Sequence, residues 1–157
     1  MMTAAVPSAE DLRQLYRELI LDHARSPRHF NKLSGATHQA EGINPLCGDK
    51  LKLYLTIEAD GTIDDASFEG SGCAISVASA SLLTDTVIGL TTSEAQAFFR
   101  SVIASLTGSD QVAEEDLGKL VALGGVRDFP SRVKCATLAW HALNAAINKD
   151  SETATTE

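Results

Sequence analysis

The sequence predicts an α+β fold in which a small antiparallel sheet of about three strands packs under a layer of helices. Two observations support this prediction. Residues 50–70 contain two runs rich in Leu, Ile, Thr, Tyr and Phe, joined by Asp60-Gly61, a pair typical of a β-hairpin. From Cys73 onward, in contrast, apolar residues recur at helical spacing. A hairpin followed by helices is expected to carry the helical layer on one face of the sheet.

The N-terminal part is expected to form one helix and then an irregular connection. Residues 11–25 have apolar side chains at helical spacing, with Ser8 as a candidate cap. Pro27 follows this pattern, and the Gly, Asn and Pro residues up to Pro45 predict a connection with one short strand near residues 38–41. The first strand of the hairpin alternates leucine with lysine, so only one face of the sheet is expected to be covered.

Four helical segments are expected after the hairpin: residues 73–88, 92–107, a shorter piece near 114–123, and 131–148. A chain of 157 residues is long enough to bury a core as one domain. We therefore predict a single domain over residues 1–157, with an ordered core over about 9–149. The C-terminal stretch DSETATTE has little apolar surface to bury, which predicts a flexible tail over 150–157.

Charge and hydropathy exclude several classes of partner. The 13 Lys and Arg residues against 21 Asp and Glu give a net charge of −8, so a phosphate backbone would repel the chain. The first residues lack the apolar core of a secretory signal, and no window approaches the roughly 18 apolar residues that a membrane helix needs. We therefore expect a cytoplasmic protein with no nucleic-acid and no membrane partner.

The three cysteines, Cys47, Cys73 and Cys135, are far apart and odd in number, which argues against a disulfide framework. Free cysteines are often small buried apolar side chains, and that interpretation stays open here. Their backbone context favours metal or sulfur chemistry instead. Cys47 stands two residues before Asp49 in NPLCGD, and in an extended chain such residues point the same way, roughly 7 Å apart.

Two of the cysteines are in positions that favour the thiolate. Cys73 follows Gly-Ser-Gly at the expected start of a helix, where free N–H groups and the helix dipole stabilise negative charge. Cys135 is expected in the first turn or so of the last helix. Arg132 and Lys134 lie beside it, and opposite charge lowers the pKa of a thiol.

Three thiolates and one carboxylate suit zinc, which accepts sulfur and oxygen ligands in a tetrahedron. Calcium and magnesium prefer oxygen ligands alone. Such a zinc site has a net negative charge that is costly to remove from water, so we expect a shallow and partly exposed site.

Longer stretches of sequence resemble a known family. NPLCGD, GSGCAISVASAS and FPSRVKCATLAW are similar to the three cysteine motifs of the IscU/NifU N-terminal family of iron–sulfur assembly proteins, and LYRELILDHARSPRHF resembles its opening helix. The matches run from about Leu15 to Ile147 in the order of the family. The resemblance implies an IscU/SufU-like fold.

Two departures from IscU resemble the SufU branch of this family. IscU-type scaffolds have a histidine immediately before the third cysteine, where this chain has Lys134. The stretch between Cys73 and Cys135 is also longer than in IscU, with the surplus in the acidic region 108–119. SufU-type proteins have such an insertion.

The resemblance to SufU implies a zinc-dependent sulfurtransferase that accepts persulfide sulfur from a cysteine desulfurase of SufS type and supplies downstream SUF cluster-assembly proteins. Carried over by motif, the zinc ligands are Cys47, Asp49, Cys73 and Cys135, and Cys47 is the catalytic sulfur acceptor. In this mechanism the desulfurase displaces Cys47 from the zinc. Arg132 is either a residue that hydrogen-bonds a zinc ligand or steadies the displaced Cys47 thiolate, or a plain surface arginine. The four histidines are expected to be surface or packing residues.

Two rival functions stay open. The first is an IscU-type scaffold that assembles a transient [2Fe-2S] cluster on the same ligands, and the second is a structural zinc domain that binds a partner. Lys134 favours the sulfurtransferase, because a lysine ammonium cannot replace the missing histidine as a ligand at neutral pH.

Overall fold

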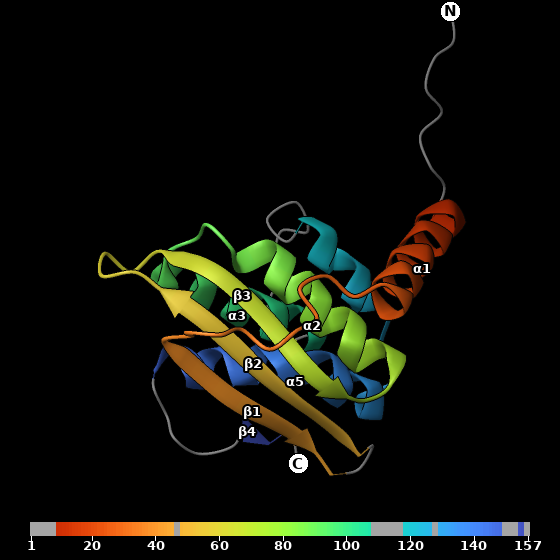
Figure 1. Ribbon diagram of the computed structural model, residues 1–157. Helices are drawn as coiled ribbons and strands as arrows, with labels where there is room; N and C mark the ends of the chain where they lie inside the picture. Colours follow the sequence, from red (N-terminus) through yellow and green to blue (C-terminus); the bar gives the residue numbers. More distant parts are fainter. Residues whose placement is uncertain (1–8, 46–47, 108–117, 127–128, 149–153, 156–157) are drawn as a thin grey trace, which may run out of the picture.

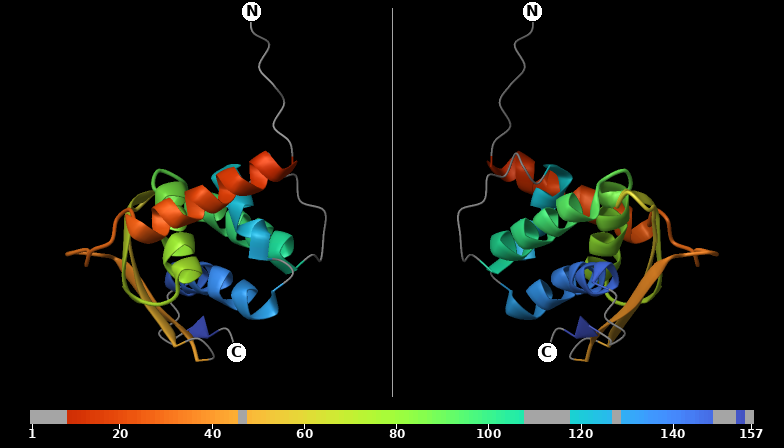
Figure 2. Two further views of the ribbon diagram at one scale, coloured as in Figure 1. Left: turned by 90° about the vertical axis from the view of Figure 1, so that its right-hand side faces the viewer. Right: turned by 90° about the vertical axis from the view of Figure 1, so that its left-hand side faces the viewer.

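The computed structural model describes residues 9–45, 48–107, 118–126, 129–148 and 154–155 (Figure 1). In chain order the elements are α1 Ala9–Arg25, β1 His38–Asn44, β2 Asp49–Ile57, β3 Ile63–Ser71, α2 Ala74–Val87, α3 Thr92–Thr107, the 3-10 helix η1 Gly118–Val126, α5 Pro130–Ile147 and β4 Ala154–Thr155. Figure 2 shows α2, α3 and α5 on one side of the sheet. The predicted α+β architecture is confirmed.

The sheet has the strand order β3-β2-β1-β4. Its antiparallel part consists of β1, β2 and β3, as predicted, and β1 extends beyond the expected residues 38–41 to Asn44. The two residues of β4 lie parallel to β1, opposite Gly42 and Ile43. This pairing was not predicted, because DSETATTE has no strand pattern. The flexibility expected for residues 150–157 stays a prediction.

The β2–β3 hairpin turns at Asp60-Gly61, as the sequence predicted. Gly61 has a φ of +90°, a conformation that glycine adopts without strain, and Asp60 Oδ1 accepts a hydrogen bond from the Thr62 N–H at 2.9 Å. The alternating leucines of β2 are buried against the helices, as expected. The opposite face is less open than expected, because Tyr54 is also buried there, with its hydroxyl donating to Glu69.

The helices α2 and α5 lie against each other and against the sheet. Trp140 of α5 is fully buried, and its Nε1–H donates to Ser79 Oγ of α2 at 3.2 Å. Ser79 Oγ donates in turn to the main-chain oxygen of Ala136 at 2.5 Å. A Cβ on Gly42 of β1 would lie 3.1 Å from Leu138, so α5 also approaches the sheet closely. Trp140 is therefore a core residue.

Most predicted helix boundaries agree with the structure to within one or two residues. The exception is the piece expected near 114–123, which overlaps the 3-10 helix η1, while residues 108–117 lie outside the described part of the chain. Within the described ranges no helix combines the length and the apolar character needed to cross a membrane.

Candidate metal centre

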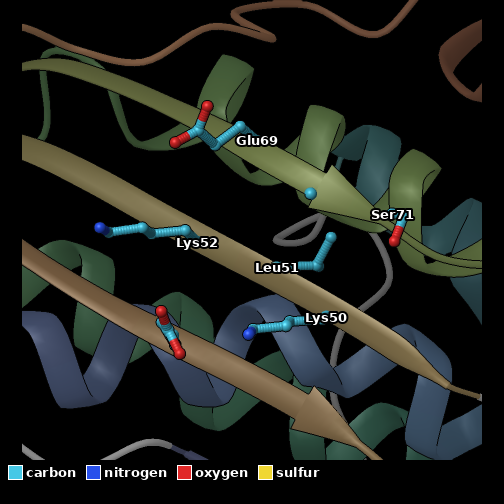
Figure 3. Close-up of a pocket in the computed structure, with 7 residues that line it drawn as sticks. Lys50, Leu51, Lys52, Glu69 and Ser71 are labelled. Atoms are coloured by element: carbon cyan, nitrogen blue, oxygen red, sulfur yellow. The ribbon is translucent and has the colours of Figure 1, made fainter.

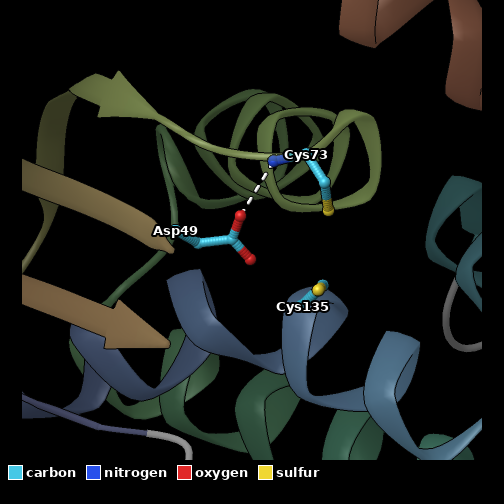
Figure 4. A group of neighbouring side chains, drawn as sticks. All are labelled: Asp49, Cys73 and Cys135. Atoms are coloured by element: carbon cyan, nitrogen blue, oxygen red, sulfur yellow. Dashed lines mark hydrogen bonds between the residues drawn. The ribbon is translucent and has the colours of Figure 1, made fainter. Parts of the chain in front are cut away.

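Three of the four predicted ligands lie together at one end of the sheet. Asp49 is the first residue of β2, Cys73 directly precedes α2, and Cys135 lies on α5. One carboxylate oxygen and the two sulfur atoms are all within 4.8 Å of one another, and the side chains converge in Figure 4. In the described part of the chain this is the one group of three or more His, Cys, Asp or Glu side chains that could share a metal ion.

The spacing fits a tetrahedral metal site. With zinc–sulfur bonds of about 2.3 Å, neighbouring sulfur ligands of a tetrahedron are about 3.8 Å apart, so a spread of up to 4.8 Å needs only a small closure. Two sulfurs and one carboxylate suit zinc, and cysteine thiolates also hold iron–sulfur clusters. Calcium and magnesium do not suit a set with two sulfurs.

Asp49 is fixed by hydrogen bonds at both of its oxygens. The Cys73 main-chain N–H donates to Oδ1 at 2.8 Å, and the Ser76 hydroxyl donates to Oδ2 at 2.6 Å. The Asn44 side-chain amide lies 3.5 Å from Oδ2. Asp49 is only 1% exposed, and these donors offset the cost of removing its carboxylate from water.

Cys73 is the N-cap residue directly before α2, where the sequence predicted the helix start, and it has an extended backbone and no side-chain capping bond. Its thiol is half-buried. Burial raises the pKa of this thiol and the Asp49 charge adds to that effect. The backbone N–H of Ser76, which hydrogen-bonds the sulfur, and the side-chain contacts with the Ser76 hydroxyl and with Cys135 outweigh both, so the pKa of Cys73 lies below its ordinary value. The pKa of Cys73 is therefore shifted in the direction that the sequence predicted.

Cys135 lies deeper than the sequence predicted. It is the sixth residue of α5, which begins at Pro130, and therefore belongs to the second helical turn, where the helix dipole has less effect than in the first. Its side chain is fully buried, with the Asn44 amide nitrogen 3.5 Å from Sγ. The expectation of a shallow site is therefore wrong for Asp49 and Cys135, because hydrogen bonds compensate the carboxylate and the packing of α5 covers the sulfur.

The sequence also named Cys47, Arg132 and Lys134 beside this group. Cys47, the predicted fourth ligand and sulfur acceptor, lies outside the described residues, so both of its roles stay predictions. Arg132 has an exposed side chain in the first turn of α5, and Lys134 is half-buried. The proposed role of Arg132 beside a ligand also stays a prediction.

The histidines make packing and hydrogen-bonding contacts outside the group of Asp49, Cys73 and Cys135. His23 is buried and contacts Ser81 Oγ at 2.7 Å, and His141 packs edge-on against the ring of Phe99. The remaining two contact threonine hydroxyls: His29 with Thr84 and His38 with Thr37.

Two residues of the site were missed in the sequence, Asn44 and Ser76. Both are fully buried beside the ligands, and Asn44 Oδ1 has no hydrogen-bond partner in the structure described. Ser76 had a usable signal, because a residue three positions after Cys73 lies on the same helix face. Asn44 contacts Asp49 because the two residues pair across β1 and β2, whereas its contact with Cys135 depends on how α5 meets the sheet.

A separate shallow pocket of about 220 Å³ lies on the outer face of the sheet (Figure 3). A row of alternating charge crosses it, in which Lys52 of β2 pairs with Glu41 of β1 on one side and Glu69 of β3 on the other. Lys50 also lines the pocket, and consecutive residues of a strand point to opposite faces, so Asp49 points away from it. The pocket is therefore not part of the candidate metal centre.

Comparison with known proteins connects this geometry to iron–sulfur assembly. The sequence profile of the family described as NifU-like N terminal domain matches residues 15–155. The scaffold protein IscU of Streptococcus pyogenes serotype M1 is 40% identical over 138 residues, which cover 88% of this chain and 86% of that protein. The zinc-dependent sulfurtransferase SufU of Bacillus subtilis (strain 168) is 38% identical over 140 residues, which cover 89% and 94%.

A solved structure shows the same fold. It is described as an iron–sulfur cluster assembly scaffold protein for the SUF system from Fervidobacterium islandicum AW-1, and it matches with a TM-score of 0.80 at 33% identity over 86% of this chain and 98% of that one. The IscU/SufU-like fold predicted from the sequence is therefore confirmed. Because an IscU and a SufU are similar to this chain at nearly equal identity, overall identity does not single out either branch.

Proposed function

Because the chain belongs to the NifU-like N-terminal domain family of iron–sulfur cluster assembly proteins, we propose that within this family it is a zinc-dependent sulfurtransferase. It accepts persulfide sulfur from a cysteine desulfurase of SufS type and passes it to downstream SUF cluster-assembly proteins. The observation that carries this proposal is the convergence of Asp49, Cys73 and Cys135, with a lysine instead of a histidine before the last of them.

Zinc is the resident metal that the donor set favours. Asp49, Cys73 and Cys135 supply one oxygen and two sulfurs, and Cys47 is the fourth ligand in this proposal. When bound, zinc keeps cysteine sulfurs deprotonated without changing its own oxidation state, which suits a protein that handles sulfur. A lysine ammonium has no lone pair to offer, so with lysine at residue 134 the set relies on Asp49 for its non-sulfur ligand.

We assign the transfer step to Cys47. Its thiolate attacks the outer sulfur of the desulfurase persulfide, the sulfur–sulfur bond of the donor breaks, and the desulfurase cysteine leaves as a thiolate. The outer sulfur and its proton then belong to a persulfide on Cys47, so the step needs no oxidant. Asp49 and Cys73 are tied to each other by a hydrogen bond and Cys135 is fixed within α5, which suits permanent ligands better than an acceptor.

The second candidate is a scaffold that assembles a transient [2Fe-2S] cluster on the same side chains. Two observations favour it: the similarity to the Streptococcus pyogenes IscU scaffold, and the two cysteine sulfurs, which also suit a cluster. Metal analysis separates the two candidates. A colourless protein that holds one zinc supports the sulfurtransferase, whereas a brown protein that holds iron supports the scaffold.

The proposal is tested by the rate of a SufS-type desulfurase. An acceptor that removes sulfur from the desulfurase speeds its turnover, so alanine release from cysteine should rise when the zinc-loaded protein is added. The Cys47→Ala variant should not raise it. An equal rise with the variant would contradict the assignment of Cys47, and no rise with the wild type would favour the scaffold.

A further inference from the structure

The hydroxyl of Ser76 lies between two of the candidate metal ligands. Its Oγ is 2.6 Å from Asp49 Oδ2 and 3.6 Å from Cys73 Sγ. Ser76 is fully buried, three residues after Cys73 in the first turn of α2. A hydroxyl has one proton to donate, and the shorter contact gives that proton to the carboxylate.

The main chain fixes the other side of the same carboxylate. The Cys73 N–H holds Oδ1 at 2.8 Å, and a Cβ built on Gly72 would lie 2.8 Å from that oxygen. The Asp49 carboxylate therefore occupies the space that a side chain at residue 72 would need. With Oδ1 held by the main chain, the orientation of Oδ2 depends on Ser76.

Asn44 is the other polar group that could orient Oδ2, but its contact is weaker. Its amide nitrogen is 3.5 Å from Oδ2, beyond the usual N–H···O range of 2.7–3.2 Å. The same nitrogen is equally far from Cys135 Sγ, so it is shared between two acceptors. Ser76 therefore makes the main hydrogen bond to this oxygen.

We infer that Ser76 is a positioning residue for the metal site, whose hydroxyl orients the Asp49 carboxylate beside Cys73 so that the metal meets a preformed pair of ligands. This inference rests on the zinc site of the proposed function. Groups that hydrogen-bond a metal ligand without touching the metal commonly change metal affinity by 10- to 100-fold.

A purely structural role makes a different prediction. Cys73 makes no side-chain cap for α2, so Asp49 and Ser76 could serve only to complete the start of this helix. In that case the variant Ser76→Ala would lower the stability of the metal-free and the zinc-loaded protein equally. Its zinc affinity would then equal that of the wild type.

The test is a competition between the protein and a chromophoric chelator for zinc, with wild type, Ser76→Ala and Ser81→Ala. Ser81 is the matched control, because it is a buried serine of the same helix whose hydroxyl contacts His23 and the Arg28 N–H instead of a ligand. We expect Ser76→Ala to bind zinc about 10- to 100-fold more weakly and Ser81→Ala to bind like the wild type.

The absorption of the cobalt-loaded protein gives a second readout. A misplaced carboxylate should weaken the visible bands typical of tetrahedral cobalt in Ser76→Ala but not in Ser81→Ala. Unchanged affinity and unchanged bands in Ser76→Ala would overturn the inference while leaving the zinc site intact. A wild type that does not bind zinc would instead contradict the proposed function itself, and this inference with it.

Discussion

The main-chain N–H of Cys73 donates to Asp49 Oδ1 at 2.8 Å, so the first residue of β2 satisfies a free amide at the start of α2. Helix starts normally obtain such a partner from a nearby side chain of their own segment. Here the partner comes from a strand 24 residues earlier. The Asp49 carboxylate thus joins the sheet to α2 and also belongs to the candidate metal centre. Experiments on the metal-free protein test the first role, and zinc binding tests the second.

Replacing Asp49 by alanine should destabilise the protein even without metal. The variant leaves the Cys73 N–H and the Ser76 hydroxyl without their buried acceptor, and such a loss costs about 1–3 kcal/mol. Urea unfolding of the metal-free protein measures this change. Asp64→Ala, at an exposed aspartate of β3, is the control and should leave the free energy of unfolding nearly unchanged. Equal stability of the two metal-free variants would contradict the capping role of Asp49.

Gly72→Ala should disturb the metal site although residue 72 has no side chain that could bind a metal. The new Cβ would lie 2.8 Å from Asp49 Oδ1, so the carboxylate must move. We expect a loss of about 1–3 kcal/mol in stability, as for other overpacked sites, together with weaker zinc binding. The neighbouring exposed Ser71, replaced by alanine, is the control. Zinc binding by Gly72→Ala that matches Ser71→Ala would show that the carboxylate tolerates the displacement.

Lys134→His tests whether the residue before the last cysteine separates a sulfurtransferase from a scaffold. A neutral imidazole can ligate the iron of a cluster, whereas the lysine ammonium cannot. After reconstitution with iron and sulfide, we expect stronger visible absorption in Lys134→His than in the wild type. Lys134→Gln removes the charge without adding a ring nitrogen and should resemble the wild type. If the wild type and Lys134→His retain equal amounts of iron–sulfur cluster, residue 134 does not decide between cluster assembly and sulfur transfer.

Tyr54 should make the fold sensitive to alkaline pH. Burial, the hydrogen bond to Glu69 and the charges of Glu69 and Glu41 raise the pKa of Tyr54 to about 12, above about 10 for a free phenol. The folded state therefore favours the neutral phenol. Its contribution to stability is fully present below pH about 10 and is lost as the pH rises from about 10 to 12.

The check is denaturant unfolding across this alkaline range, with Tyr54→Phe as the comparison. The variant cannot ionise at residue 54, so its stability should fall less between pH 10 and 12 than that of the wild type. Ultraviolet absorption of the folded wild type and of Tyr54→Phe, followed as the pH rises, reports tyrosine ionisation in each protein. The difference between the two curves gives the ionisation of Tyr54 alone. Ionisation near pH 10 in the folded protein would contradict the effect of its buried position.

The features that the sequence predicted well depend on local signals. Asp60-Gly61 specifies its own turn, and alternation along β2 specifies which side chains face the helices. The Gly-Ser-Gly before Cys73 marked the start of α2. The resemblance to the family motifs named Cys47, Asp49, Cys73 and Cys135 as one group, and the last three of these converge in the structure.

The features that the sequence did not predict depend on packing between distant segments. Helical spacing places Ser76 on the same face as Cys73, but no local pattern encodes its contact with Asp49, 27 residues earlier. The depth of Cys135 follows from how α5 packs under the sheet. The pairing of β4 with β1 likewise depends on a free strand edge, which sequence alone does not reveal.

The most direct test of the proposed sulfurtransferase is mass spectrometry of the zinc-loaded protein after incubation with a SufS-type desulfurase and cysteine. The proposal predicts a gain of one sulfur on the wild type, localised to Cys47 and absent from Cys47→Ala and from a sample without cysteine. No gain on the wild type, or the same gain on Cys47→Ala, would contradict it.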